Sequence, residues 1–156
     1  MAETPYNVVK TKDNARLQCN TRHVTNKTSV MRAKPQLMSC KQSSFSISLA
    51  PYCGRLIVAK DVHAYERVYN RLSGSTRKID QTQCGECSSH VDAKGRFRLV
   101  IYAINMPSLI HELSHGVFFL FDHCGVEASN THTEPFCYMI DHLFGQIVKR
   151  GKIKLP

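Results

Sequence analysis

The sequence has no hydrophobic run long enough to cross a membrane. Its longest apolar stretches, LVIYAI and GVFFLF, contain six residues each, whereas a membrane-spanning helix needs roughly 18 to 20. A basic segment followed by an apolar one, the pattern of a secretory signal, is also missing from the amino-terminal residues. We therefore expect the protein to stay in the cytoplasm of the cell that makes it.

Disulfide pairing, internal repeats and recognisable nucleic-acid-binding motifs are not evident either. The seven cysteines are an odd number, which together with the missing export signal favours reduced thiols. The length of 156 residues suffices for one domain with a sizeable core and is short for two. Hydrophobic and charged shares of 42% and 21% are ordinary for a soluble globular protein. The composition therefore predicts one folded domain.

Positive charge is concentrated in the amino-terminal part of the chain. The net charge is +9, and residues 1–50 hold eight Lys and Arg against two Asp and Glu, whereas residues 111–156 hold four against five. Such a basic region attracts nucleic acid or an acidic protein through counterion release and electrostatic steering. It is also compatible with a soluble surface that has no dedicated partner.

Two parts of the chain differ in their pattern. Residues 1–43 are rich in Thr, Asn, Gln, Ser, Lys and Arg and have few regularly spaced large apolar residues, which is typical of an irregular or partly mobile arm. Residues 44–156 alternate strand-like and helix-like patterns. We therefore expect a basic polar arm over 1–43 and a folded domain over 44–156.

The first half of that domain reads as strands with one helix between them. SFSISLA and RLIVAK are strand-like, and a helix capped by Asp61 is predicted to end at about Leu72. A short strand ending near Val91, a hairpin turn at DAKG and a strong strand from Arg96 to Ile104 follow. This order predicts an α+β fold with a small antiparallel-containing sheet.

Two helices are predicted after the last strand. Asn105 as the cap and Pro107 in the first turn start a helix that runs to about Asp122. Another helix starts near Thr133 and has an apolar stripe on one side. On the earlier helix, four apolar residues fall on one side and are predicted to be its core face: Leu109, Leu113, Val117 and Leu120.

The sequence HELSH, residues 111 to 115, lies on the earlier of these helices. His111 and His115 are four residues apart and share one helical face, so their ring nitrogens can reach one zinc ion at about 2.0 to 2.1 Å. Glu112 is placed to take a proton from a zinc-bound water. With this composition, chance would give roughly 0.015 such motifs. A zinc site with Glu112 as general base is therefore predicted, the alternative being two structural histidines.

A catalytic zinc site needs a third protein ligand. Glu134 is the first choice because it opens the next helix, where it shares a face with Tyr138 and Asp141, and His132 is the second. A carboxylate stabilised by the helix dipole is the alternative reading of Glu134. Phe121 stands where a metzincin would have its third histidine, which excludes that class. The other nearby candidates are Asp122, His123 and Glu127.

The chain contains HELSH, then 18 intervening residues, and then Glu134 in EPFCYMIDHL. This spacing resembles the pattern of gluzincin zinc metallopeptidases. The order of strand, helix, hairpin, HExxH helix and EPF helix resembles, over about residues 50–148, the small minigluzincin-like metallopeptidases of tailed bacteriophages. The resemblance implies a minimal zincin-like domain in which His111, His115 and Glu134 bind zinc. Glu112 would act as general base and then general acid. For a phage protein the location would be the host cell cytoplasm.

The resemblance also implies a protein or peptide substrate. The strand from Arg96 to Ile104 would supply the sheet edge on which an extended peptide lies. A downstream histidine that stabilises the oxyanion in related enzymes has no clear counterpart here. The candidates for contacting the transition state or supporting a zinc ligand are Tyr138, Asp141 and His142.

Two further interpretations stay open. Cys84 and Cys87 in CGEC have the spacing of half a metal site, although a simple turn with two thiols is the plainer interpretation. The alternative to an enzyme is a non-catalytic binding protein, stabilised by zinc, that serves a phage in the virion or in host takeover. In that alternative the histidines matter and the proton-carrying role of Glu112 does not.

Overall fold

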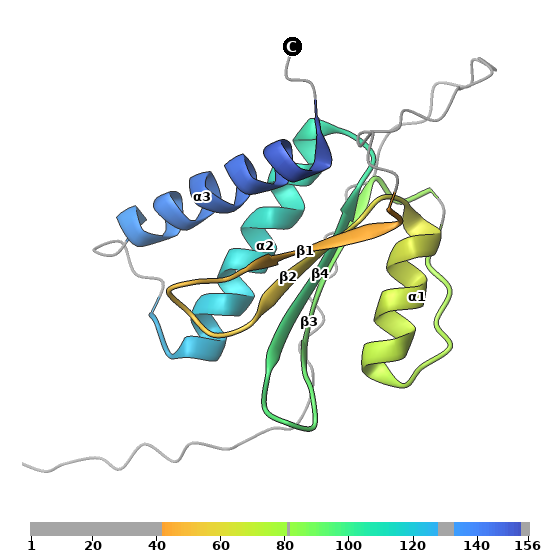
Figure 1. Ribbon diagram of the computed structural model, residues 1–156, viewed down its shortest axis with the longest axis horizontal. Coiled ribbons are helices and arrows are strands. Elements are labelled where there is room, and N and C mark those ends of the chain that lie inside the picture. The colour runs from red at the N-terminus through yellow and green to blue at the C-terminus, as the bar shows by residue number, and fades with distance from the viewer. Residues whose placement is uncertain (1–41, 81, 128–132, 154–156) are drawn as a thin grey trace, which may run out of the picture. The chain divides into compact units, whose positions relative to one another are not determined.

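Four strands and three helices make up the part of the chain that the computed structural model describes, residues 42–80, 82–127 and 133–153 (Figure 1). This is an α+β fold, as the sequence predicts. The first strand of the described residues, β1, spans Ser44–Ser48, which is the alternating stretch SFSIS. The predicted arm over 1–43 lies outside the described residues except for Gln42 and Ser43.

The sheet is mixed, with the strand order β1-β2-β4-β3. Strands β1 and β2 (Arg55–Ala59) are antiparallel, and β3 (Gly85–Val91) forms an antiparallel hairpin with β4 (Phe97–Ala103). Strands β2 and β4 are parallel. A parallel pair needs a long connection, and the helix α1 (Val62–Ser73) followed by β3 supplies it.

The expectation that the strand from Arg96 to Ile104 forms a sheet edge is wrong. Strand β4 pairs with β2 on one side and with β3 on the other, and residues 99–103 are all buried. Its sequence, FRLVIYA, places apolar side chains on both faces of the sheet. A central strand is covered on both faces, so this position buries both sets of side chains. The edges of the described sheet are β1 and β3.

Helices cover both faces of the sheet (Figure 1). Helix α1 packs on one face through a cluster that includes Tyr65, Val68 and Tyr102. Helices α2 (Met106–Cys124) and α3 (Thr133–Gly151) pack on the other face, where the core includes Leu99 and Leu113. None of the helices in the described residues is long and apolar enough to cross a membrane.

Helix α2 forms where the sequence predicts it. The side chain of Asn105 accepts a hydrogen bond of 2.8 Å from the backbone N–H of Ser108, which satisfies one of the free donors at the helix start. Gly125, in the left-handed conformation with φ 68°, ends the helix, two residues later than predicted. The predicted core residues Leu109, Leu113, Val117 and Leu120 are all 0% exposed. The opposite side of α2 is therefore left for the histidines.

Candidate metal and catalytic site

His111 and His115 lie next to each other on the outer side of α2. Their Nε2 atoms are 3.2 Å apart, and the rings are nearly perpendicular, with centroids 4.7 Å apart. Two nitrogens bound to one tetrahedral zinc at 2.0 to 2.1 Å would be about 3.3 Å apart. The spacing of the two imidazoles thus fits two corners of a zinc site.

The same 3.2 Å contact is a hydrogen bond when one Nε2 carries a proton and the other accepts it. Burial, and next the neighbouring His111, lower the pKa of His115, so its ring is neutral at physiological pH. A neutral imidazole is the form that binds metal. Binding one cation through both Nε2 atoms would require the shared proton to leave or to move to Nδ1.

Glu112 points to a different side of α2, toward the edge strand β3. Its carboxylate accepts a hydrogen bond from the backbone N–H of Cys87. Burial between α2 and β3, and next the negative charge of Glu86, raise the pKa of Glu112 to about 7, although the Cys87 hydrogen bond opposes the rise. A carboxyl group with this pKa can both accept and release a proton near neutral pH.

Gly85 in β3 makes the close approach of Glu112 possible. A Cβ atom at position 85 would lie 2.8 Å from Cγ of Glu112 and 3.0 Å from the backbone oxygen of Tyr102. Sequence reasoning did not find this contact, or the one with Cys87. The available signal was a glycine within a strand pattern, which often marks a close backbone approach.

We expect Gly85→Ala to destabilise the protein by about 1 to 3 kcal/mol, because the methyl group forces Glu112 or β3 to move. Gly145→Ala is the matched control, since a Cβ at position 145 of α3 meets nothing within 4 Å. In a helix, that change should stabilise by up to about 1 kcal/mol. Urea unfolding of the two variants measures the difference, and equal midpoints would show that Glu112 does not fill the space at Gly85.

Glu134 does not join the two histidines. It is exposed in the first turn of α3, where the nearby Phe136 packs against Phe118 at a centroid distance of 4.4 Å. Phe118 is three residues beyond His115, about 4.5 Å further along the helix axis. Within residues 42–80, 82–127 and 133–153, no group of three His, Cys, Asp or Glu side chains could hold a metal ion.

The remaining ligand candidates lie elsewhere. Asp122, His123 and Glu127 are exposed at the carboxyl end of α2 and just beyond it, and the ring of His123 stacks on Phe97 at 4.3 Å. His132 lies outside the described residues. Seven residues separate His115 from Asp122, which is about 10 Å along the helix. The end of α2 is thus too distant to complete a site at the histidine pair.

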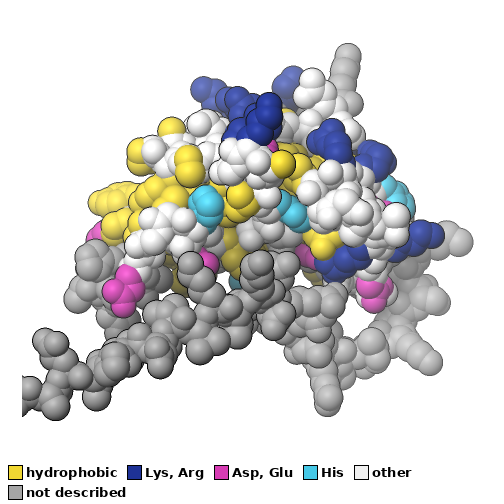
Figure 2. All heavy atoms as spheres, turned by 90° about the horizontal axis from the view of Figure 1, so that it is seen from below, with side chains coloured by type: hydrophobic (Ala, Val, Ile, Leu, Met, Phe, Trp, Pro, Cys, Tyr) yellow, Lys and Arg dark blue, Asp and Glu magenta, His cyan; other side chains and the backbone are white. Residues whose placement is uncertain are grey.

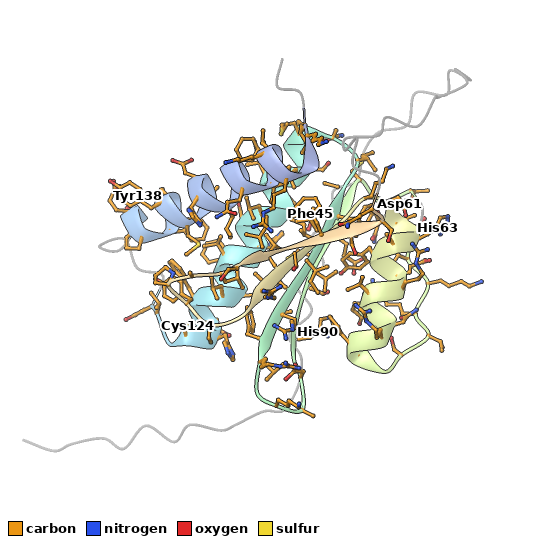
Figure 3. All side chains as sticks on the ribbon, viewed as in Figure 1. Phe45, Asp61, His63, His90, Cys124 and Tyr138 are labelled. Carbon is orange, nitrogen blue, oxygen red and sulfur yellow. The ribbon has the colours of Figure 1, made fainter. Side chains whose placement is uncertain are left out.

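Tyr138, Asp141 and His142 are all exposed on α3. Tyr138 is 69% exposed and points outward from the helix (Figure 3). The Nε2 atom of His142 lies 3.1 Å from the side-chain nitrogen of Gln146, one turn further along α3. These three side chains therefore face solvent.

Cys84 and Cys87 do not form the predicted turn. Cys84 directly precedes β3 and is exposed, whereas Cys87 lies within β3 and packs in the core cluster on the α2 side. Residues three apart in an extended strand point to opposite faces. The two thiols are thus not arranged to hold one metal ion between them.

Comparisons with known proteins give no assignment. No protein-family model, no curated protein and no solved structure matches the chain.

Proposed function

We propose that the protein is a zinc-dependent hydrolase of the metallopeptidase type. The observation that carries the proposal is the 3.2 Å separation of the Nε2 atoms of His111 and His115, next to the partly buried carboxyl group of Glu112 on the same helix. Two imidazoles are two of the three protein ligands that a catalytic zinc site requires, and a carboxyl group with a pKa near 7 on the same helix is a candidate general base.

The roles of the residues follow from their positions. His111 and His115 would hold zinc, which when bound supplies a Lewis acid and makes water more acidic. Glu112 would take the proton from the attacking water and later pass it to the leaving amine. Glu112 lies against β3, where a Cβ atom at Gly85 would be 2.8 Å from its Cγ, which limits the directions in which it can transfer a proton.

A peptide is the substrate class that we favour. Strand β3 pairs with β4 only, so its other side is an edge of the described sheet, and an extended peptide can add to such an edge by backbone hydrogen bonds. Phe118, which is 49% exposed, lies on the same helical face as His111 and His115 and offers apolar contact to a substrate side chain.

We keep Glu134 as the proposed third zinc ligand on the gluzincin resemblance alone, with His132 as the second choice. The described structure places Glu134 apart from the two histidines, so binding would require its side chain to move toward them. Glu134 is exposed on α3, whereas the histidines lie on α2. Its role as a zinc ligand can therefore be tested independently of theirs. Asp141, exposed on the same helix, provides a matched carboxylate control.

Zinc content tests the site directly. We expect one zinc per chain in the intact protein and less than about half in His115→Ala and Glu134→Gln, because each loses a ligand. Asp141→Asn should keep full zinc. Elemental analysis after dialysis against buffered zinc measures all four proteins. Zinc retained by Glu134→Gln would remove Glu134 from the site, whereas zinc absent from the intact protein would remove the site itself. Hydrolysis is tested separately, by replacing Glu112.

A further inference from the structure

Within residues 42–80, 82–127 and 133–153, no helix packs an apolar cluster against one side of strand β1. Phe45 and Ile47 point to the core shared with α2 and α3. The alternating serines of SFSIS therefore point to the α1 face of the sheet. The apolar cluster beneath α1 draws its strand residues from β2 and β4 and includes none from β1. The serine side of β1 is therefore available to form one wall of a groove.

Arginines line that groove. A depression of about 390 Å³ between β1 and α1 is lined by Ser44, Ser46, Arg55, Arg71 and Arg98, among other residues. A second depression of about 290 Å³ shares Ser44 and Arg71 with the first and adds Arg67. We call the two together the arginine groove. Among the residues that the structure describes, no Asp or Glu lines either depression.

The positive charges of the arginine groove are poorly compensated. In the part of the chain that the structure describes, no ion pair joins Arg55, Arg67 or Arg71 to a carboxylate. Arg98 lies 3.6 Å from Asp92, but Asp92 is engaged more closely by Arg96, at 2.7 Å. Guanidinium groups that repel one another around one hollow create a field that favours an anion.

We infer that the arginine groove binds the phosphate backbone of a nucleic acid. All four cations are arginines, whose planar fork matches the oxygens of a phosphate, and the hydroxyl groups of Ser44 and Ser46 add donors and acceptors of the kind that contact phosphates. Two adjoining depressions that share Ser44 and Arg71 suit a chain of repeated charges better than a single small anion. Because the contacts come from charge and hydroxyl groups, binding should depend little on base sequence.

An acidic peptide fits the groove less well. A peptide would gain most by adding a strand to the free edge of β1. That edge is already engaged, because Arg150 of α3 donates a hydrogen bond of 2.7 Å to the backbone oxygen of Ser46. The apolar contacts that usually fix peptide side chains are also few in the walls of the groove.

The arginine groove is separate from the histidine pair. The groove opens on the α1 face of the sheet, whereas His111 and His115 belong to α2 on the other face (Figure 1). Viewed from below, Lys and Arg side chains lie along the top and down the right side of the described surface, and a few acidic side chains lie among those on the right (Figure 2). Nucleic-acid binding is therefore independent of the zinc proposal and can succeed or fail alone.

The test uses the full chain, because residues 1–50 carry six more basic than acidic residues and contribute equally to every variant. Fluorescence anisotropy with labelled 20-nucleotide single-stranded and duplex DNA is recorded over a series of salt concentrations. The groove variant is Arg55→Gln with Arg71→Gln, both exposed positions. The control variant, Lys94→Gln with Lys149→Gln, loses the same charge from exposed positions outside the groove. Circular dichroism confirms that each variant folds.

We expect the groove variant to bind DNA about 10- to 100-fold more weakly at low salt, with a salt slope lower by about two. The control variant should stay within about threefold of the intact protein. Arg55→Lys with Arg71→Lys should restore the slope, because charge is restored. Equal losses in the groove and control variants, or unchanged binding in the groove variant, would overturn the inference. Tighter binding of a labelled polyglutamate peptide than of DNA, lost in the groove variant, would replace nucleic acid by an acidic protein.

Discussion

Glu112→Gln is expected to slow hydrolysis by about 10³-fold while leaving zinc bound. Glutamine keeps the size of the side chain and can still accept the hydrogen bond from the N–H of Cys87, but it cannot take up a proton at neutral pH. General acid–base groups contribute roughly 10² to 10⁴ to enzymatic rates. Glu112 is not among the proposed ligands, so metal content should stay that of the intact protein.

The measurement is a proteomic comparison of cells that express the intact protein, Glu112→Gln or Glu127→Gln. Glu127 is an exposed glutamate beyond the end of α2, so its variant controls for loss of a carboxylate. New protein termini should appear with the intact protein and with Glu127→Gln, and not with Glu112→Gln. If Glu112→Gln keeps the biological effect of the intact protein while His115→Ala loses it, the protein is a zinc-stabilised binding module.

The same substitution should stabilise the metal-free protein above pH 7. The pKa of Glu112 is raised from 4.5 to about 7 in the folded state, so below pH 4.5 the group is protonated in both states and destabilises nothing. Between pH 4.5 and 7 the unfolded chain ionises first, and folding stability falls as pH rises. A shift of that size corresponds to about 3 kcal/mol, which exposure to solvent reduces to about 2 kcal/mol. Glu112→Gln removes this loss.

Urea unfolding in a chelator at pH 4.5, 6 and 8 measures the effect. The intact protein and Glu112→Gln should have similar stability at pH 4.5 and diverge by about 2 kcal/mol at pH 8. Glu66→Gln provides a control of opposite sign. The backbone N–H of Ile79 donates to Glu66 at 2.8 Å and lowers the pKa of that carboxyl group. The stabilisation from Glu66 is therefore complete above its unfolded pKa of 4.5, and Glu66→Gln should be less stable than the intact protein by the same amount at pH 6 and pH 8. Parallel curves for Glu112→Gln and the intact protein would contradict a buried, neutral Glu112.

The local features of α2 could be predicted because they depend on short sequence patterns. The cap at Asn105 and the buried stripe of Leu109, Leu113, Val117 and Leu120 follow from helical spacing and the chemistry of helix ends. The same is true of α1, where the side chain of Asp61 accepts from the N–H of Ala64 at 2.8 Å. Once the helix is predicted, the closeness of His111 and His115 is predicted too, because residues four apart share one helical face.

The features that sequence reasoning missed depend on residues far apart in the chain. The strand order puts β4 inside the sheet and β3 at its edge, and no local pattern encodes which strands become neighbours. The contact of Gly85 with Glu112 joins residues 27 positions apart. The place of Glu134 relative to the histidines depends on how α3 crosses α2, which the packing of Phe136 against Phe118 helps to fix. The spacing of residues along the sequence does not specify the angle at which two helices cross.

The connection between β4 and α2 consists of Ile104 and Asn105 only. With Asn105 capping the helix and Leu109 buried against the sheet, the rotation of α2 about its own axis is set by the folded core. The histidine rings consequently acquire their mutual orientation during folding, and a cation that arrives later meets ligands that are already ordered. The conformational entropy lost on metal association should therefore be small.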